Sequence, residues 1–248
     1  MSTPVSRLSP PELWVVRLGY LAYSEALDLQ RSVARARITG AVPHDVLLLV
    51  EHPPVVTLGR TSKRANLTSS TDVLGAAGVE LFEVERGGDV TFHGPGQLVG
   101  YPIIDLKRHK QDLHWYLRRV EDALVRALAE FGLVCQRSVG YTGVWTRGCS
   151  EGNEVALRKI ASIGVHSRDW VTWHGFALNV TTDLSYFDHI VPCGIRDVEM
   201  TSMARELGRN VAITAVENAV SRAFGEVFSL LPKPVAPASL AAPMASIG

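Results

Sequence analysis

Residues 159–180 read KIASIGVHSRDWVTWHGFALNV and contain two strand candidates, Lys159–His166 and Trp170–Val180. The first alternates apolar and small residues after an opening lysine, a pattern that favours a strand. Outside this stretch, further strands are predicted at Leu13–Leu18, Val46–Glu51, Val55–Leu58, Val79–Glu85, Leu98–Leu106 and Gly143–Thr146. Helical patterns separate these short runs, and the chain shows neither repeats nor an internal linker rich in Pro, Gly and Ser. We therefore expect a single α/β (α+β) domain.

Three amphipathic helices are predicted between the strands. The clearest follows Asp112, where apolar residues recur every three or four positions until Gly132 ends the helix. A second helix is expected to open with Thr214 and Glu217 as a capping box, and a weaker one spans about 24–38.

The two ends of the chain are expected to lie outside the folded domain. Residues 1–12 are predicted to be an N-terminal extension, and residues 13–230 the single domain. Residues 231–248 are rich in Pro, Ala and Ser, which is typical of a disordered tail.

Composition excludes several classes of protein. The chain has 248 residues, 25 basic and 25 acidic side chains and no formal net charge, so no global charge attracts nucleic acid or an anionic membrane. Its three cysteines, Cys135, Cys149 and Cys193, show no CxxC spacing, which argues against a disulfide framework or a structural zinc site. The longest apolar runs are too short to cross a bilayer. We expect a cytoplasmic protein that binds neither nucleic acid nor membranes.

The glycine-rich segment 86–97, RGGDVTFHGPGQ, is the first candidate for chemistry. Glycine permits positive φ and leaves backbone amides uncovered, so a ligand carbonyl could be held there while Arg86 and His93 donate from their side chains. A glycine-rich hairpin with a surface arginine and a core histidine is an equally good interpretation. The glycine spacing matches neither a dinucleotide fingerprint nor a P-loop.

Two other residues, Lys159 and Cys193, form a second candidate. Cys193 lies between Pro192 and Gly194 in a turn that would present its thiol, although an ordinary buried cysteine is an open alternative. Lys159 opens a strand, where the spacing alone favours a solvated lysine at the strand end. Cys149 is a rival nucleophile, and Cys135 follows apolar residues and reads as structural.

Missing motifs narrow the possible activities. There is no G-x-S-x-G elbow, which disfavours a serine hydrolase of the α/β type. The eight histidines lack metal-site spacing, so no metal is expected.

Four blocks taken together carry a resemblance to a known family: RGGDVTFHGPGQLVGYPIIDL (86–106), KIASIGVHS (159–167), HGFALNV (174–180) and IVPCGI (190–195). In this order they resemble the lipoyl(octanoyl) transferases, members of the biotin/lipoate protein ligase fold group, over roughly residues 13–228. The resemblance implies a mixed β-sheet flanked by helices, with a smaller second sheet beside it. It also implies a monomer without a cofactor.

The resemblance assigns roles to residues of this chain. It makes Cys193 the nucleophile that carries an acyl thioester and Lys159 the residue that makes this thiol reactive. The acyl pocket would be lined by Arg86, Gly87, Gly88, Asp89, Val90, Thr91, Phe92, His93, Ser162, Ile163, Gly164, Gly175, Phe176 and Ala177.

The implied reaction transfers an octanoyl group from octanoyl-acyl carrier protein to a lysine of a lipoyl domain. The acceptors would be the lipoyl domains of 2-oxoacid dehydrogenase complexes and the glycine cleavage H protein. Because acyl carrier proteins are acidic, a basic patch should face them, and 107–110 or Arg60 with Lys63 and Arg64 are candidates. The alternatives are an ATP-dependent lipoate or biotin ligase and a non-catalytic acyl-binding protein.

Overall fold

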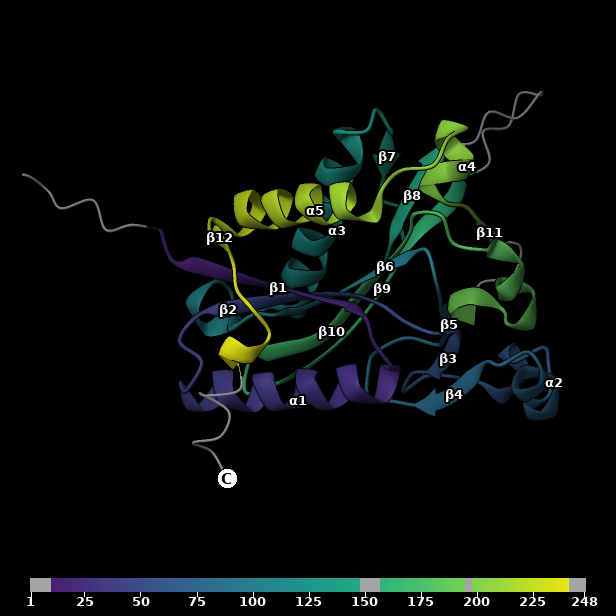
Figure 1. Ribbon diagram of the computed structural model, residues 1–248, viewed down its shortest axis with the longest axis horizontal. Helices are drawn as coiled ribbons and strands as arrows, with labels where there is room; N and C mark the ends of the chain where they lie inside the picture. The colour runs from purple at the N-terminus through teal and green to yellow at the C-terminus, as the bar shows by residue number, and fades with distance from the viewer. Residues whose placement is uncertain (1–9, 148–156, 195–197, 241–248) are drawn as a thin grey trace, which may run out of the picture.

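The computed structural model of the protein describes residues 10–147, 157–194 and 198–240. A large mixed sheet dominates the fold, and a three-stranded sheet lies beside one end of it (Figure 1). This arrangement confirms the expected mixed sheet with a smaller second sheet. The large sheet has the spatial order β12 (Leu231–Pro234), β1 (Glu12–Tyr20), β2 (Asp45–Glu51), β6 (Gln97–Ile103), β10 (Val171–Asn179), β9 (Leu157–Arg168), β8 (Val144–Arg147) and β7 (Cys135–Gln136), with β11 (Glu199–Met200) pairing β9.

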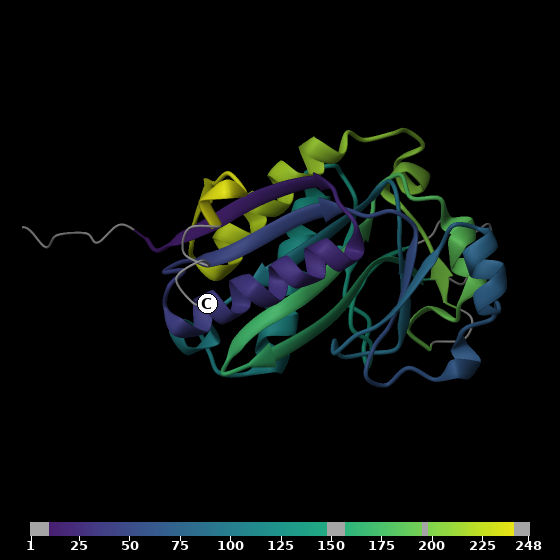
Figure 2. The ribbon, with the colours of Figure 1, turned by 60° about the horizontal axis from the view of Figure 1, so that its bottom comes forward.

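Helices cover both faces of the large sheet. Helix α1 (Tyr23–Thr39) packs on one face, and α3 (Leu113–Ala129) and α5 (Ile213–Phe228) pack on the other (Figures 1 and 2). Strand β2 shows why both layers form. Successive strand residues point to opposite faces, so Leu47 and Leu49 enter the core under α3 and α5, while Val46 and Leu48 enter the core under α1.

The small sheet consists of β4 (Glu80–Glu83), β3 (Val55–Leu58) and β5 (Val90–His93), in that order. Strand β3 runs parallel to β4 and antiparallel to β5. The small sheet has its own apolar cluster, to which Leu74 of α2 (Thr71–Ala76) and Phe187 of the 3-10 helix η3 (Leu184–His189) contribute. The remaining short helices are η1 (Arg64–Asn66), η2 (Leu106–Arg108), η4 (Pro192–Gly194) and α4 (Met203–Leu207).

The predicted helices are present, but the residue predicted to cap the start of α5 is wrong. Asp112 caps α3 by accepting a hydrogen bond from the backbone N–H of Trp115. Helix α5 instead begins at Ile213, after Ala212, and has no side-chain cap. Thr214 therefore lies inside the first turn and is not the cap of a capping box.

The predicted boundary of the C-terminal tail is also wrong. Residues Leu231–Pro234 form the edge strand β12, parallel to β1, and the Leu240 side chain is fully buried in the core under α1. Proline lacks an N–H but is tolerated at a sheet edge, where alternate residues still donate. Here Leu231 donates to the Pro11 carbonyl and Val235 to the Val15 carbonyl. The described chain thus stays attached to the sheet through Leu240.

Candidate active site

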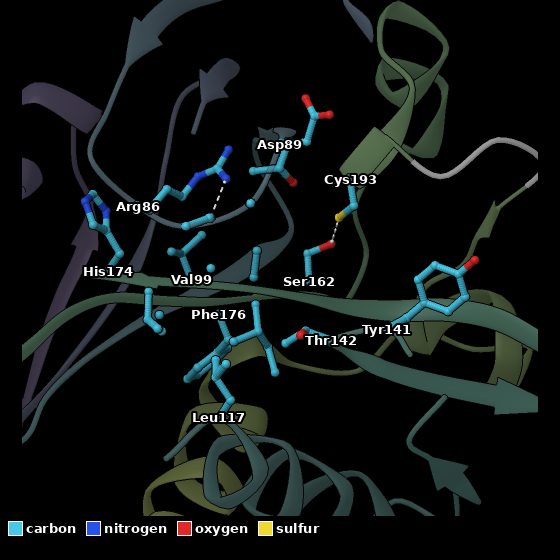
Figure 3. A pocket seen from close by; sticks show the side chains of 18 of the residues that line it. Arg86, Asp89, Val99, Leu117, Tyr141, Thr142, Ser162, His174, Phe176 and Cys193 are labelled. Atoms are coloured by element: carbon cyan, nitrogen blue, oxygen red, sulfur yellow. Dashed lines mark hydrogen bonds between the residues drawn. The ribbon is translucent and has the colours of Figure 1, made fainter. Parts of the chain in front are cut away.

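A cavity of about 630 Å³ lies where the glycine-rich segment, β9, β10 and η4 meet. Figure 3 shows Arg86, Asp89 and Cys193 on one side of the central strands, with Phe176 and Leu117 on the other. The volume of this cavity falls within the range of small-molecule binding sites. The segments that form it are far apart in sequence, so only the folded chain creates it.

Cys193 is presented to this cavity by a strained turn. Its φ of 56° lies in the left-handed region, which a non-glycine residue seldom adopts. The next residue, Gly194, also has a positive φ, 66°, and donates its N–H to the Val191 carbonyl at 2.9 Å. Asn66 fastens the turn, because its carbonyl accepts from the Val191 N–H and its amide donates to Asp89. The two left-handed residues place the half-buried thiol at the cavity wall.

Lys159 reaches the same point from β9. Its side chain is 1% exposed, and its Nζ lies 3.1 Å from the Sγ of Cys193 although the two residues are 34 positions apart. The Ser162 hydroxyl is 3.9 Å from the same sulfur (Figure 3). Among the described residues no carboxylate pairs with the Lys159 ammonium, which leaves the thiol as its polar partner. A buried lysine beside a cysteine in a cavity is an arrangement that stabilises a thiolate.

Comparisons with known proteins show the family of the chain. Residues 22–225 match the family described as the lipoyl protein ligase A/B catalytic domain. The chain belongs to this family. A curated octanoyltransferase of Acidobacterium capsulatum is 50% identical over 223 residues, which cover 86% of this chain and 89% of the relative. An octanoyltransferase of Rubrobacter xylanophilus is 51% identical over 211 residues, covering 84% of this chain and 90% of the relative. The expected resemblance to the octanoyltransferases is thereby confirmed.

Solved structures support the fold of this lipoyl ligase A/B domain. A structure described as a bi-partite lipoate protein ligase and its E2 lipoyl domain from Thermoplasma acidophilum matches with a TM-score of 0.73 at 18% identity, covering 96% of this chain and 92% of that one. A lipoate-protein ligase A bound with ATP matches with a TM-score of 0.70 at 18% identity, covering 96% and 94%. At this identity the likeness concerns the fold alone.

The cavity is lined by most of the residues that were predicted to form the acyl pocket. Those that line it are Arg86, Gly87, Gly88, Asp89, Thr91, His93, Ser162, Ile163, Gly164, Gly175, Phe176 and Ala177. Val90 and Phe92 do not, because alternate residues of β5 face opposite ways. Both are buried in the core of the small sheet, where Phe92 stacks on Tyr186. Their prediction as pocket walls is wrong for this reason.

Arg86 is an internal residue of the site. Its side chain is 6% exposed and its guanidinium donates to the carbonyl and hydroxyl of Thr57 and to the Gly87 carbonyl, so the alternative of a surface arginine is wrong. Burial lowers the pKa of Arg86, while the nearby Cys193 and Asp89 oppose that effect. An arginine remains charged in proteins, so Arg86 brings a positive charge to the cavity wall.

Four of the residues that line the cavity are buried polar rings: Tyr23, His93, Tyr101 and His174. Burial raises the pKa of Tyr23 to about 12 and lowers that of His93 to about 3. It also raises the pKa of Tyr101 and lowers that of His174. All four rings are therefore uncharged at neutral pH. Of the four, only His93 is predicted from the sequence, since the other three are scattered over α1, β6 and β10.

The remaining cysteines divide into two cases. Cys135 lies half-buried in β7, where burial raises the pKa of its thiol to about 12, as fits a structural cysteine. Cys149, the rival nucleophile, lies outside the described residues.

The two predicted basic patches differ in their surroundings. The turn 107–110 is engaged internally: Lys107 pairs with Asp105, His109 with Asp45 and Lys110 with Asp112. The loop of Arg60, Lys63 and Arg64 is exposed and lies against the glycine-rich segment, since Arg60 and Lys63 donate their backbone N–H groups to the Arg86 carbonyl and the Asp89 carboxylate. None of its three side chains has an ion-pair partner within the described ranges. The second patch therefore lies beside the cavity.

In the part of the chain that the structure describes, no group of three His, Cys, Asp or Glu side chains is placed to hold a metal ion. No described helix is long and apolar enough to cross a membrane.

Proposed function

We propose that this protein is an octanoyltransferase that carries the acyl group on Cys193, with Lys159 as the partner that activates the thiol. The distance of 3.1 Å between Lys159 Nζ and Cys193 Sγ is the observation that supports this most directly. The octanoyltransferases that share half of its residues support the acyl group transferred.

In the first step the Cys193 thiolate attacks the carbonyl carbon of an octanoyl thioester on an acyl carrier protein. A new carbon–sulfur bond forms on Cys193, and the bond to the carrier's sulfur breaks. The carrier leaves as a thiol after taking up one proton. Lys159 as ammonium stabilises the attacking thiolate and is a donor for that proton. Exchange of one thioester for another is nearly isoenergetic, so the step requires no nucleotide.

In the second step a lysine of the acceptor lipoyl domain attacks the acyl-enzyme. A carbon–nitrogen bond forms, the carbon–sulfur bond breaks, and Cys193 is released as a thiolate. A free lysine is mostly protonated near neutral pH, with an ordinary pKa of ~10.4, so the incoming amine must lose a proton. Solvent takes that proton before the attack, and the nitrogen loses a second proton as the amide forms. Lys159, neutral after the first step and beside the reacting atoms, accepts this second proton and becomes an ammonium again. Conversion of a thioester to an amide is downhill, which again needs no cofactor.

The cavity has the composition of an acyl slot. Apolar walls come from Val99, Ile163, Val165, Phe176 and Ala177. At ~0.8 kcal/mol per buried methylene, an eight-carbon chain contributes roughly 5 kcal/mol of binding. Glycines at 87, 88 and 164 keep the wall free of side chains along the chain's path.

The exposed loop of Arg60, Lys63 and Arg64 is the surface we assign to the acidic carrier protein. It lies next to Gly88 and Asp89, at the cavity that holds Cys193. The proposed acceptors are the lipoyl domains of 2-oxoacid dehydrogenase complexes and the glycine cleavage H protein. We propose that the protein acts as a cytoplasmic monomer.

Intact mass spectrometry tests the acyl-enzyme. Incubation with octanoyl-acyl carrier protein should add one octanoyl group to the wild-type chain and none to Cys193→Ala, with Cys135→Ala as the matched control that still acylates. An adduct that persists in Cys193→Ala would refute the assignment. Transfer from free octanoate only with ATP would instead identify a ligase. Binding of the acyl donor without any covalent adduct would identify an acyl-binding protein.

A further inference from the structure

The ammonium of Lys159 is buried without a carboxylate to balance it in the described part of the chain, so its charge needs another source of stabilisation. A lysine ammonium has three N–H donors, and the Cys193 sulfur accepts one of them. The remaining contact is with a ring. Lys159 Nζ lies over the indole of Trp145, 5.3 Å from the ring centroid.

We propose that Trp145 is a positioning residue of the active site, whose indole face holds the Lys159 ammonium and so favours the ammonium–thiolate pair with Cys193. This inference depends on the proposed role of the Lys159–Cys193 pair. The face of an aromatic ring carries negative electrostatic potential, and indole attracts cations most strongly. The attraction is largest where water is excluded, and the Trp145 side chain is only 4% exposed.

Strand pairing determines where the indole lies. Trp145 on β8 is the direct antiparallel partner of Lys159 on β9, and the register shifts between Val144 and Trp145. Such an irregularity re-aims a side chain. The Trp145 Nε1–H is buried and has no hydrogen-bond partner among the described residues. An indole placed only for packing would normally satisfy that donor, so its orientation is explained by the contact of its face with the ammonium.

Gly143 leaves room for the lysine to reach the ring and the thiol. Its φ is +134°, and a Cβ there would lie 2.8 Å from the Lys159 Cε. The Glu121 carboxylate holds this turn by accepting the Gly143 N–H at 3.0 Å. Because Glu121 also pairs with Arg118 and Arg137, its charge is balanced by these two guanidinium groups.

Several other charged groups lie near the pair in the part of the chain that the structure describes. On the side of Cys193, the positive charge of Arg86 acts on the sulfur, and Asp89 is bound by the Asn66 amide. On the side of β11, Arg158 pairs with Glu206 and Glu199 pairs with Arg205. The ring that packs near Trp145 is Tyr141, whose centroid is 6.1 Å away. Among the described residues, Trp145 is therefore the group besides the thiol that contacts the ammonium.

The test follows the pH dependence of Cys193 alkylation by iodoacetamide, read at the Cys193 peptide by mass spectrometry. We expect Trp145→Leu to raise the midpoint of alkylation by about one pH unit, because the ammonium loses its aromatic partner. Trp145→Phe should retain part of the effect. Trp14→Phe, a distant tryptophan substitution, should leave the midpoint unchanged.

A second series guards against a variant that fails to fold. Site-specific replacement of Trp145 by mono-, di- and trifluorotryptophan keeps the shape of the ring while weakening its attraction for cations. The midpoint should rise step by step with fluorination, and octanoyl transfer at neutral pH should fall by up to about tenfold and recover at higher pH. A midpoint that stays constant through the series while Lys159→Met shifts it overturns the role of Trp145. A midpoint that Lys159→Met leaves unchanged refutes the Lys159–Cys193 pair itself.

Discussion

Replacing Lys159 by methionine separates its chemical contribution from its packing. Methionine fills a similar volume without a charge, so the buried side chain is kept while the contact with Cys193 Sγ at 3.1 Å loses its ammonium. A thiol with the ordinary cysteine pKa of ~8.5 is about 3% ionised at pH 7. Loss of the cation therefore lowers the thiolate population by up to roughly 30-fold. The aminolysis step also loses its proton acceptor, typically a further 10²–10⁴-fold.

Stability should move in the opposite direction from activity. Burying an ammonium is costly, and replacing buried ionic groups by apolar ones is often neutral or stabilising by about 1–4 kcal/mol. We expect Lys159→Met to unfold at the same or higher urea concentration than the wild type. Single-turnover acylation by octanoyl-acyl carrier protein, followed by intact mass, measures the first step, and transfer to a lipoyl domain measures the second. An acylation rate within threefold of the wild type would refute the reasoning, provided that urea unfolding shows an intact fold.

Three further predictions concern other parts of the molecule. Because burial lowers the pKa of His52 to about 4 and of His93 to about 3, the unfolded chain binds protons that the folded one does not once the pH falls below 6.5. Each of the two histidines should therefore lower the free energy of unfolding by about 2 kcal/mol at pH 5. Urea titration should show lower stability at pH 5 than at pH 7, and His93→Gln should remove part of that difference. Equal stability at both pH values would contradict this. Gly143→Ala should destabilise by about 1–3 kcal/mol and slow acylation, since φ is +134° and the new Cβ meets the Lys159 side chain. The control is Gly132→Ala, at a φ of +83° with no atom within 4 Å of the new Cβ and outside the cavity lining, which should lose stability but leave acylation unchanged. Leu240→Ala should lower the free energy of unfolding by about 2–4 kcal/mol, which urea titration would measure, and a change below 0.5 kcal/mol would show that this residue does not anchor the C-terminal segment.

Local sequence signals identified most of the large sheet and its helices. Strand β9 and helix α3 were recognised because a repeating apolar pattern is a direct consequence of one face being buried. Strand β5 was missed within the glycine-rich segment because its four residues are too short for an alternation to stand out. Strand β12 was missed because Pro, Ala and Ser favour disorder, while a sheet edge tolerates proline.

In the candidate site, too, the sequence predicted some features and not others. The four sequence blocks pointed to Cys193 and Lys159 as the reacting pair, because the resemblance concerns residue types in a fixed order. The blocks alone did not show that Val90 and Phe92 face away from the cavity, since that depends on which face of β5 packs on the small core.

The sequence by itself determined the family, the positions of most strands and helices, and the chemical identity of the two residues proposed to react. The tertiary structure decided that Lys159 is buried and reaches the thiol, that a left-handed turn presents Cys193, and that the Lys159 Nζ lies over the Trp145 ring. The reason is physical: residue type and local pattern set propensity and burial, whereas the reactivity of a thiol depends on distances between groups that strand pairing brings together from 34 positions apart.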